Sequence, residues 1–193
     1  MENMKILIFD NYDSFTYNIV HYVENILNQK VDVYRNDEIT LEEIDKYDKI
    51  ILSPGPGVPD DAGLLKPLIK KYAPTKSIFG VCLGMQAMTE VYGGEIKNLD
   101  TVYHGIATPV VQIGNDKIIY KDIPKEFEAG RYHSWIVDNR TLPECFKVSA
   151  FDSDSQIMSM FHTEYDLRGV QFHPESVLTP MGEQMIKNWL LNN

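Results

Sequence analysis

Cysteine and positive charge are both scarce in this sequence. Of its 193 residues two are cysteines, Cys82 and Cys145. They are too few for a disulfide framework and lack the paired spacing of a zinc site. The 28 acidic residues exceed the 18 basic ones, and the formal net charge is -10. This balance argues against nucleic acid or an anionic membrane as the main partner, because both require a basic patch.

Long hydrophobic runs are also missing. No apolar stretch approaches the roughly 18 residues that span a membrane, and the N-terminus lacks the pattern of a secretory signal. We therefore expect a cytoplasmic protein with both cysteines reduced. The hydrophobic content of 44% and the charged content of 24% are those of an ordinary folded protein. The length predicts a single domain over 1–193.

Strands and helices alternate in the first half of the chain. Short apolar runs, typical of strands buried on both faces, precede segments with apolar residues at three- and four-residue spacing. The predicted strands cover 5–9, 31–34, 49–52 and 77–81, and the predicted helices cover 14–27, 41–46, 63–72 and 83–92. Asp13 or Ser14 is expected to cap the first helix. The alternation predicts a parallel sheet with helices on both faces.

The second half is richer in strand patterns. Strands are predicted at 109–113, 117–120, 146–151, 157–161 and 169–172, with turn residues between them. They suggest an antiparallel extension of the same sheet. A closing helix is expected to start with Thr179 as its cap and Pro180 in the first position. Its apolar face is formed by Met185, Ile186, Trp189 and Leu190.

Cys82 lies in the segment Gly80-Val81-Cys82-Leu83-Gly84, between a predicted strand and a predicted helix. This is the cysteine version of the nucleophile elbow, a sharp turn that holds the nucleophile outward while glycines leave room for the backbone. Aligned N–H groups at a helix N-terminus favour the thiolate, which is the attacking form. The alternative is a buried structural cysteine, to which this segment alone gives about equal weight.

A base and an orienting group for the cysteine occur in "VQFHPES". His173 follows the predicted strand 169–172, and Glu175 lies two residues further on. Both Cys82 and His173 would then lie at the carboxyl edge of the sheet, where sites of α/β proteins form. The Glu175 carboxylate can fix the tautomer of His173 by accepting from one ring nitrogen. Taken alone, the segment also fits a plain turn.

A third element is the Pro/Gly-dense loop "SPGPG", residues 53–57, which follows another predicted strand. Attack on an amide carbon creates an oxyanion, whose stabilisation by hydrogen-bond donors lowers the barrier. The elbow supplies the N–H group of Leu83, and the loop offers that of Gly55 as a second donor. The structural alternative is a tight strand-to-helix turn without a catalytic role.

Together, "SPGPG", "GVCLGMQ" and "VQFHPES" make the sequence resemble the class I, triad-type glutamine amidotransferases over essentially its whole length. The opening "FDNYDSFTYN" is similar to that of the small subunits serving chorismate-using synthases, those of anthranilate and aminodeoxychorismate synthesis. The resemblance implies a flavodoxin-like mixed α/β sheet and a single glutamine amidotransferase domain.

The resemblance also implies a reaction. Cys82 attacks the side-chain amide of L-glutamine, His173 transfers protons, and Glu175 orients His173. Glutamate and ammonia are the products. In the family, glutamine is held at positions that match Gly55, Pro56, Gly57, Gln86, Ser134 and Trp135 of this sequence.

A separate chorismate-binding synthase subunit is the implied partner, in a hetero-oligomer. Ammonia passes to this partner, which forms anthranilate for tryptophan or aminodeoxychorismate for folate. No cofactor and no metal are expected in this subunit, and Mg²⁺ is expected only on the partner. Loop residues Tyr12, Asp13, Ser14 and Phe15 can face the partner, although Asp13 and Ser14 also suit a helix cap and Phe15 a core position.

The sequence departs from the family pattern at Met85, Ile106 and Trp135. Three alternatives remain open at this point: a cysteine hydrolase or peptidase of similar α/β fold, a non-catalytic binding module, and an amidotransferase for another acceptor. The "SPGPG" loop, Gln86 and "YHSW" favour a pocket for a small amino acid over a peptide groove. A non-catalytic module would be expected to have lost a member of the triad, and all three are present.

Overall fold

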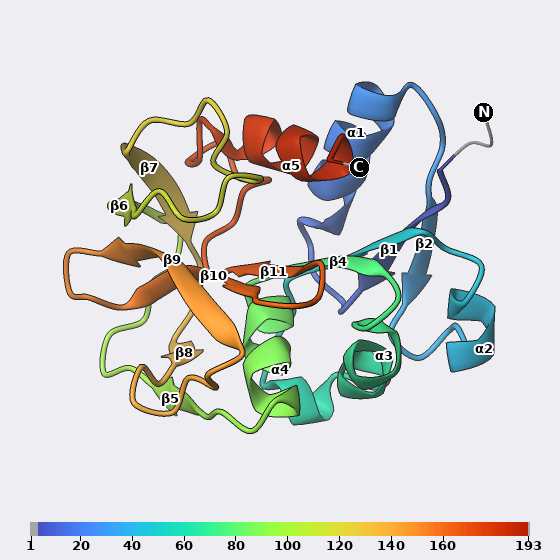
Figure 1. The fold of residues 1–193 in the computed structure, drawn as a ribbon, viewed down its shortest axis with the longest axis horizontal. Coiled ribbons are helices and arrows are strands. Elements are labelled where there is room, and N and C mark those ends of the chain that lie inside the picture. The colour runs from blue at the N-terminus through green and yellow to red at the C-terminus, as the bar shows by residue number, and fades with distance from the viewer. Residues whose placement is uncertain (1–3, 193) are drawn as a thin grey trace.

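The computed structural model describes residues 4–192 and contains one large mixed sheet (Figure 1). Across it, the strand order is β2-β1-β3-β4-β11-β10-β9-β6-β7. The first five are parallel neighbours: β2 Asp32–Arg35, β1 Ile6–Asp10, β3 Lys49–Leu52, β4 Ser77–Val81 and β11 Leu167–Val170. The antiparallel extension comprises β10 Ile157–His162, β9 Phe146–Asp152, β6 Ile106–Gln112 and β7 Glu126–Arg131.

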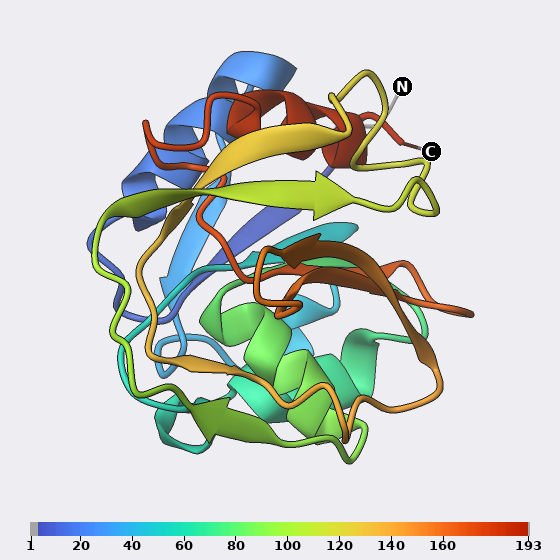
Figure 2. The same ribbon diagram turned by 90° about the vertical axis from the view of Figure 1, so that its left-hand side faces the viewer.

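Helices cover both faces of the parallel part of the sheet. On one face lie α1 Thr16–Leu27 and α5 Gly182–Leu190, which pack against each other; on the other lie α2 Leu41–Ile44, α3 Leu65–Tyr72 and α4 Leu83–Val91 (Figures 1 and 2). A short 3-10 helix, η1, covers Pro59–Asp61. A second, two-stranded sheet joins β5 Ile96–Asn98 to β8 Trp135–Val137.

Strand β1 shows how the sequence builds these layers. All five of its residues are buried. Ile6 and Ile8 belong to the core beneath α1 and α5, whereas Leu7 and Phe9 belong to the core beneath α2, α3 and α4. Because side chains alternate between the faces of a strand, a continuous apolar run supplies both cores. The predicted fold class, a mixed α/β sheet with a parallel core and an antiparallel extension, is confirmed.

Two strand predictions need correction. Residues 117–120 form turns rather than a strand, although Ile119 and Tyr120 are buried in the core. An apolar run can be buried in the core without pairing with a neighbouring strand, which explains the wrong prediction. The strand predicted at 169–172 ends at Val170 and pairs parallel with β4, so it belongs to the core of the sheet and not to the antiparallel extension.

The predicted helix caps are also wrong. Helix α1 begins at Thr16, and its N-cap Phe15 makes no side-chain cap hydrogen bond. The Asp13 carboxylate instead accepts from the Phe15 N–H at 2.8 Å, in a turn before the helix. Helix α5 begins at Gly182, with Met181 as its N-cap, rather than after Thr179. The Thr179 hydroxyl does not cap it and donates instead to the carbonyl of His173 at 2.6 Å.

Within the described part of the chain, residues 4–192, none of the helices combines the length and the apolar character needed to cross a membrane.

Candidate active site

Cys82 lies at the turn between β4 and α4, with backbone angles φ 51° and ψ -98°. A positive φ is rare for a residue with a side chain, and such strain costs on the order of 1–3 kcal/mol. A Cβ on Gly80 would lie 2.7 Å from the backbone carbon of Gly84, and one on Gly84 would lie 2.9 Å from Leu52 Cβ. The two glycines therefore allow the sharp strand-to-helix turn that the sequence predicts.

The neighbouring strand holds this turn in place. The Cys82 N–H donates to the carbonyl of Val170 at the end of β11, at 2.7 Å. Cys82 is 6% exposed and lines a small cavity. Leu83 is the first residue of α4, and its N–H has no acceptor within the helix. That N–H is therefore available for a ligand beside the sulfur.

His173 and Glu175 form a buried pair beside the cysteine. His173 Nδ1 lies 2.6 Å from Glu175 Oε1, and the two residues are 3% and 1% exposed. Burial disfavours the imidazolium, but the Cys82 sulfur and the Glu175 carboxylate outweigh that effect and raise the pKa of His173 well above its usual value. The carboxylate fixes the ring so that Nε2 is directed to the Cys82 side.

The backbone around His173 is held from two directions. The His173 N–H donates to the carbonyl of Gly130, at the end of β7, at 2.9 Å. The Thr179 hydroxyl accepts from the Gly130 N–H at 2.9 Å while it donates to the carbonyl of His173. The ring of Tyr132 lies 4.8 Å from that of His173. The imidazole thus has little freedom to move away from the cysteine.

Asn11 fixes the "SPGPG" loop against the elbow. Its N–H donates to Ser53 Oγ and its side-chain amide donates to the Ser53 carbonyl, both at 2.8 Å. A Cβ on Gly55 would lie 2.5 Å from the carbonyl oxygen of Asn11 and 2.9 Å from Leu83 Cδ2. Only glycine fits this close approach, which brings the loop and the start of α4 together. Oxyanion stabilisation by the N–H groups of Gly55 and Leu83 stays a prediction.

These elements enclose a cavity of about 160 Å³. Its lining consists of Gly55, Pro56, Gly57, Cys82, Gln86, Tyr132, His133, Ser134 and Trp135. The structure therefore brings together all six residues predicted to bind glutamine and places them beside the cysteine. Among the described residues, no group of three or more His, Cys, Asp or Glu residues is arranged to hold a metal ion.

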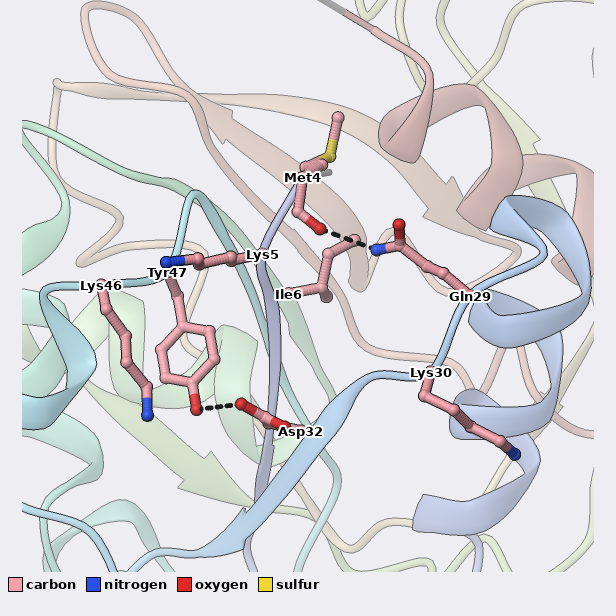
Figure 3. A pocket seen from close by; sticks show the side chains of 8 residues that line it. All are labelled: Met4, Lys5, Ile6, Gln29, Lys30, Asp32, Lys46 and Tyr47. Carbon is pink, nitrogen blue, oxygen red and sulfur yellow. Dashed lines mark hydrogen bonds between the residues drawn. The ribbon is translucent and has the colours of Figure 1, made fainter. Parts of the chain in front are cut away.

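A larger cavity, of about 470 Å³, lies at the opposite edge of the sheet, near the amino ends of β1 and β2 (Figure 3). There the Tyr47 hydroxyl donates to Asp32 at 2.6 Å, and the Gln29 amide donates to the carbonyl of Met4 at 2.7 Å. The residues that line it include neither cysteine nor histidine. It therefore offers no nucleophile with a base, and the smaller cavity is the candidate active site.

Comparison with known proteins agrees with this geometry. The sequence model described as "Glutamine amidotransferase class-I" matches residues 7–193. The chain belongs to this family. The predicted identification is confirmed, and the peptidase alternative is set aside.

Among its relatives, the amidotransferase is 42% identical to "Aminodeoxychorismate/anthranilate synthase component 2" of Bacillus subtilis, over 96% of this chain and 95% of that protein. It is 43% identical to "Aminodeoxychorismate synthase component 2" of Escherichia coli, over 96% and 98%. A solved glutamine amidotransferase from Thermotoga maritima shares the fold, with a TM-score of 0.77, 15% identity and coverage of 98% and 96%.

One wall of the amidotransferase pocket rests on a buried arginine. Arg131, 1% exposed, donates to Asp152 at 2.7 Å and from Nε to His133 Nε2 at 3.1 Å. Its guanidinium also lies 3.6 Å from the centre of the Tyr103 ring. Since Nε2 of His133 accepts, Nδ1 carries the proton and donates to the carbonyl of Trp135 at 3.1 Å. The arginine thereby orients residues 132–135.

His133 is held neutral by these surroundings. Burial and the neighbouring Arg131 charge lower the pKa of His133 to about 3. The unfolded chain takes up this proton near pH 6.5, whereas the folded chain takes it up only near the lowered pKa. The stability that depends on neutral His133 is therefore fully present above pH 6.5, and it is lost as the pH decreases from 6.5 to 3.

We expect wild-type protein to lose about 2 kcal/mol more unfolding free energy than His133→Asn when the pH is lowered from 8 to 5. Urea unfolding of both proteins at the two pH values measures this difference. Equal losses would show that His133 does not stay neutral in the folded protein.

Sequence reasoning missed several residues at this site. Gln171 and Arg131 were not predicted to take part, and Tyr132 and His133 entered the prediction only as part of the segment "YHSW". A signal was present for Gln171, which is polar in a run otherwise typical of a buried strand. A buried amide requires partners. No comparable signal marked Arg131, because arginine in a polar segment is usually exposed.

Proposed function

We propose that this chain is the glutaminase subunit of a two-component synthase and hydrolyses L-glutamine at Cys82. The observation that supports this most strongly is the buried His173–Glu175 pair beside a cysteine held at positive φ at the rim of a small pocket. A nucleophile, a base and a group that orients the base are the parts required for acyl transfer. In this proposal they belong to a single domain over residues 1–193.

In the first half of the reaction, the Cys82 thiolate attacks the side-chain carbonyl carbon of glutamine. The oxyanion that forms accepts hydrogen bonds from the N–H groups of Gly55 and Leu83. The imidazolium of His173 donates its Nε2 proton to the amide nitrogen as the C–N bond breaks. Ammonia leaves, and a γ-glutamyl thioester on Cys82 remains.

In the second half, His173 accepts a proton from a water molecule that attacks the thioester carbon. The C–S bond breaks, glutamate leaves, and the thiolate–imidazolium pair is restored. The Glu175 carboxylate stabilises the positive ring in both halves. The raised pKa of His173 supports this role, because the ring is protonated at the moment when ammonia must leave.

The pocket supports a small amino acid as substrate. Gly55, Pro56 and Gly57 line it from the loop after β3, Gln86 lines it from α4, and Ser134 and Trp135 line it at the start of β8. Backbone groups and one amide side chain suit the α-amino and α-carboxylate groups of glutamine. A cavity of about 160 Å³ is too small for a length of peptide.

Ammonia, in this proposal, is used by a separate chorismate-binding subunit in a hetero-oligomer. Support comes from the similar proteins, whose names describe component 2 of aminodeoxychorismate or anthranilate synthase. The product is anthranilate, aminodeoxychorismate or both. This subunit acts without a cofactor of its own, and Mg²⁺ belongs to the partner. The complex is cytoplasmic, in a reducing compartment that keeps Cys82 a thiol.

The rim of the pocket carries exposed apolar side chains suited to a partner. Val177 follows the triad segment and is 89% exposed, and Ile106 is 48% exposed. Their chain neighbours are close to Tyr132: its hydroxyl is 3.1 Å from Ser176 Oγ, and a Cβ on Gly105 would lie 3.4 Å from its ring. Exposed apolar groups next to a site of ammonia release favour a docked protein over water. Asp13, by contrast, already accepts from Phe15 N–H and serves a local turn.

We expect Val177→Asp to weaken partner binding by at least about 10-fold, because the charge would be buried in an apolar contact. Basal glutamine hydrolysis should stay within about twofold, since Val177 does not line the pocket. Titration of the partner with a glutamate-release readout measures both. Leu191→Asp is the matched control, because Leu191 is 52% exposed and follows α5 at the other edge of the sheet. Equal effects of the two substitutions would remove the proposed interface.

The function is tested by glutamate release from glutamine with and without the chorismate-binding subunit and chorismate. Strong stimulation by the partner, with an aromatic amine as second product, supports the proposal and identifies the acceptor. A rate of glutamate release that does not change when the partner is added would favour an amidotransferase for another acceptor.

A further inference from the structure

Gln171 is a fully buried polar residue that the proposed mechanism does not use. It directly follows β11, two residues before His173, and is 0% exposed. Its backbone N–H donates to the carbonyl of Met158 at 2.8 Å. Burial of an amide side chain is costly unless its hydrogen bonds are made. The position of those bonds therefore indicates what the residue does.

The side chain of Gln171 connects the sulfur to the pocket wall. Its Nε2 donates to Cys82 Sγ at 3.3 Å, and its Oε1 accepts from Gln86 Nε2 at 3.2 Å. Gln86 Nε2 also donates to the carbonyl of Trp135 at 2.8 Å. Three hydrogen bonds thus run from the carbonyl of Trp135, through two amides, to the nucleophile.

The direction of both amides is determined by the fixed end of this chain of bonds. The carbonyl of Trp135 can only accept, so Gln86 must direct its NH₂ group toward it. The same NH₂ group then requires an acceptor on Gln171, which leaves the Gln171 NH₂ group directed at the sulfur. A donor aimed at sulfur favours the thiolate over the thiol, because hydrogen bonds to an anion are stronger.

We propose that Gln171 is a positioning residue that orients the Cys82 sulfur as a thiolate and couples it, through Gln86, to the glutamine pocket. This inference rests on the proposed glutamine hydrolysis at Cys82. It assigns to the buried amides a role distinct from that of His173: the imidazole transfers protons, whereas the Gln171 amide holds the sulfur in position. Glutamine entering beside Gln86 and Trp135 contacts the same hydrogen-bonded chain that ends at the nucleophile.

The test is alkylation of Cys82 by iodoacetamide across a pH series, because this readout needs no glutaminase activity. Gln171→Met keeps the length of the side chain and removes the donor. We expect the midpoint of Cys82 alkylation to move to higher pH by about 0.5–1 unit, and kcat for glutamine to fall about 10-fold with a smaller change in KM. Cys145, alkylated in the same molecules and identified by peptide mass, is the internal control for unfolding.

A double-mutant cycle tests the coupling. Gln86→Met removes the donor that holds Gln171 Oε1 and so frees the Gln171 amide to turn away from the sulfur. We therefore expect it to shift the Cys82 midpoint in the same direction as Gln171→Met. The double variant should shift no further than Gln171→Met alone, because both changes act on one donor. Additive shifts would contradict the coupling and leave Gln171 acting on the sulfur alone.

An unchanged Cys82 midpoint in Gln171→Met, with Cys145 reactivity also unchanged, would overturn the proposal and make Gln171 a space-filling residue. If both thiols become more reactive, Gln171→Met is partly unfolded, and Gln171→Asn is measured in its place. The asparagine amide is one methylene too short to reach the sulfur, so the Cys82 midpoint must still rise. Failure of the proposed function gives a different result: wild-type protein releases no glutamate, although Gln171→Met still shifts the alkylation midpoint of Cys82.

Discussion

Replacing Cys82 by serine is expected to lower glutamine hydrolysis by at least about 10⁴-fold, which corresponds to about 5.5 kcal/mol of lost transition-state stabilisation. A serine hydroxyl at this turn keeps the geometry but does not form the anion that pairs with His173. The oxyanion donors and the pocket remain, so the variant should still bind glutamine. Glutamate release at saturating glutamine, with the partner and chorismate present, measures the loss.

Cys145→Ser is the matched control, since Cys145 is the other cysteine of the chain and is also a free thiol. Its side chain lies outside the pocket, and burial raises the pKa of Cys145, so it is a poor nucleophile. This variant should keep wild-type activity. Substantial hydrolysis by Cys82→Ser, or an equal loss in both variants, would show that Cys82 is not the nucleophile.

The second large effect is expected for His173→Asn, which should lower kcat about 10³-fold. Asparagine can accept and donate hydrogen bonds but cannot carry a proton to the departing ammonia. The loss should persist across the pH range in which wild-type protein is active, because no other group takes over the transfer. The pH profile of kcat therefore tests the role of the imidazole more directly than its value at one pH.

His162→Asn serves as the comparison for this substitution. His162 is also buried, at 6% exposed, but lies at the end of β10, where it stacks on Tyr165 at 4.5 Å. A variant at that position reports any general cost of replacing a buried histidine. If His162→Asn loses as much kcat as His173→Asn, the loss reflects disturbed packing rather than missing proton transfer.

The position of Cys82 could be predicted because local sequence determines it. The apolar run 77–81 became β4 with the same bounds, and Gly80 and Gly84 make the close contacts that an elbow needs. His173 could be placed at the same edge for a similar reason, since it follows a strand parallel to β4. In both cases a short segment contains enough information to place the side chain.

Strand β7 and the Arg131 cluster could not be predicted in this way. The strand contains Glu126 and Glu128 on its exposed face, and its buried residues include Arg131. Because of these charged residues, the sequence of β7 lacks the pattern of a strand. The partners that stabilise the buried arginine come from a hairpin that is distant in the sequence. Pairing between segments far apart in the sequence decides such elements. The same holds for Gln171, whose partners Cys82 and Gln86 lie on another strand-helix unit.

The central claim is that Cys82 forms a covalent intermediate with glutamine, and acid quenching during turnover tests it most directly. Peptide masses from the quenched protein should show an addition equal to glutamine minus ammonia on the peptide that contains Cys82, and none on the peptide that contains Cys145. The adduct should form far more slowly in His173→Asn, in which no group protonates the departing ammonia. Steady formation of glutamate by wild-type protein with its Cys82 unmodified at every time point, or an adduct at another residue, would contradict the account.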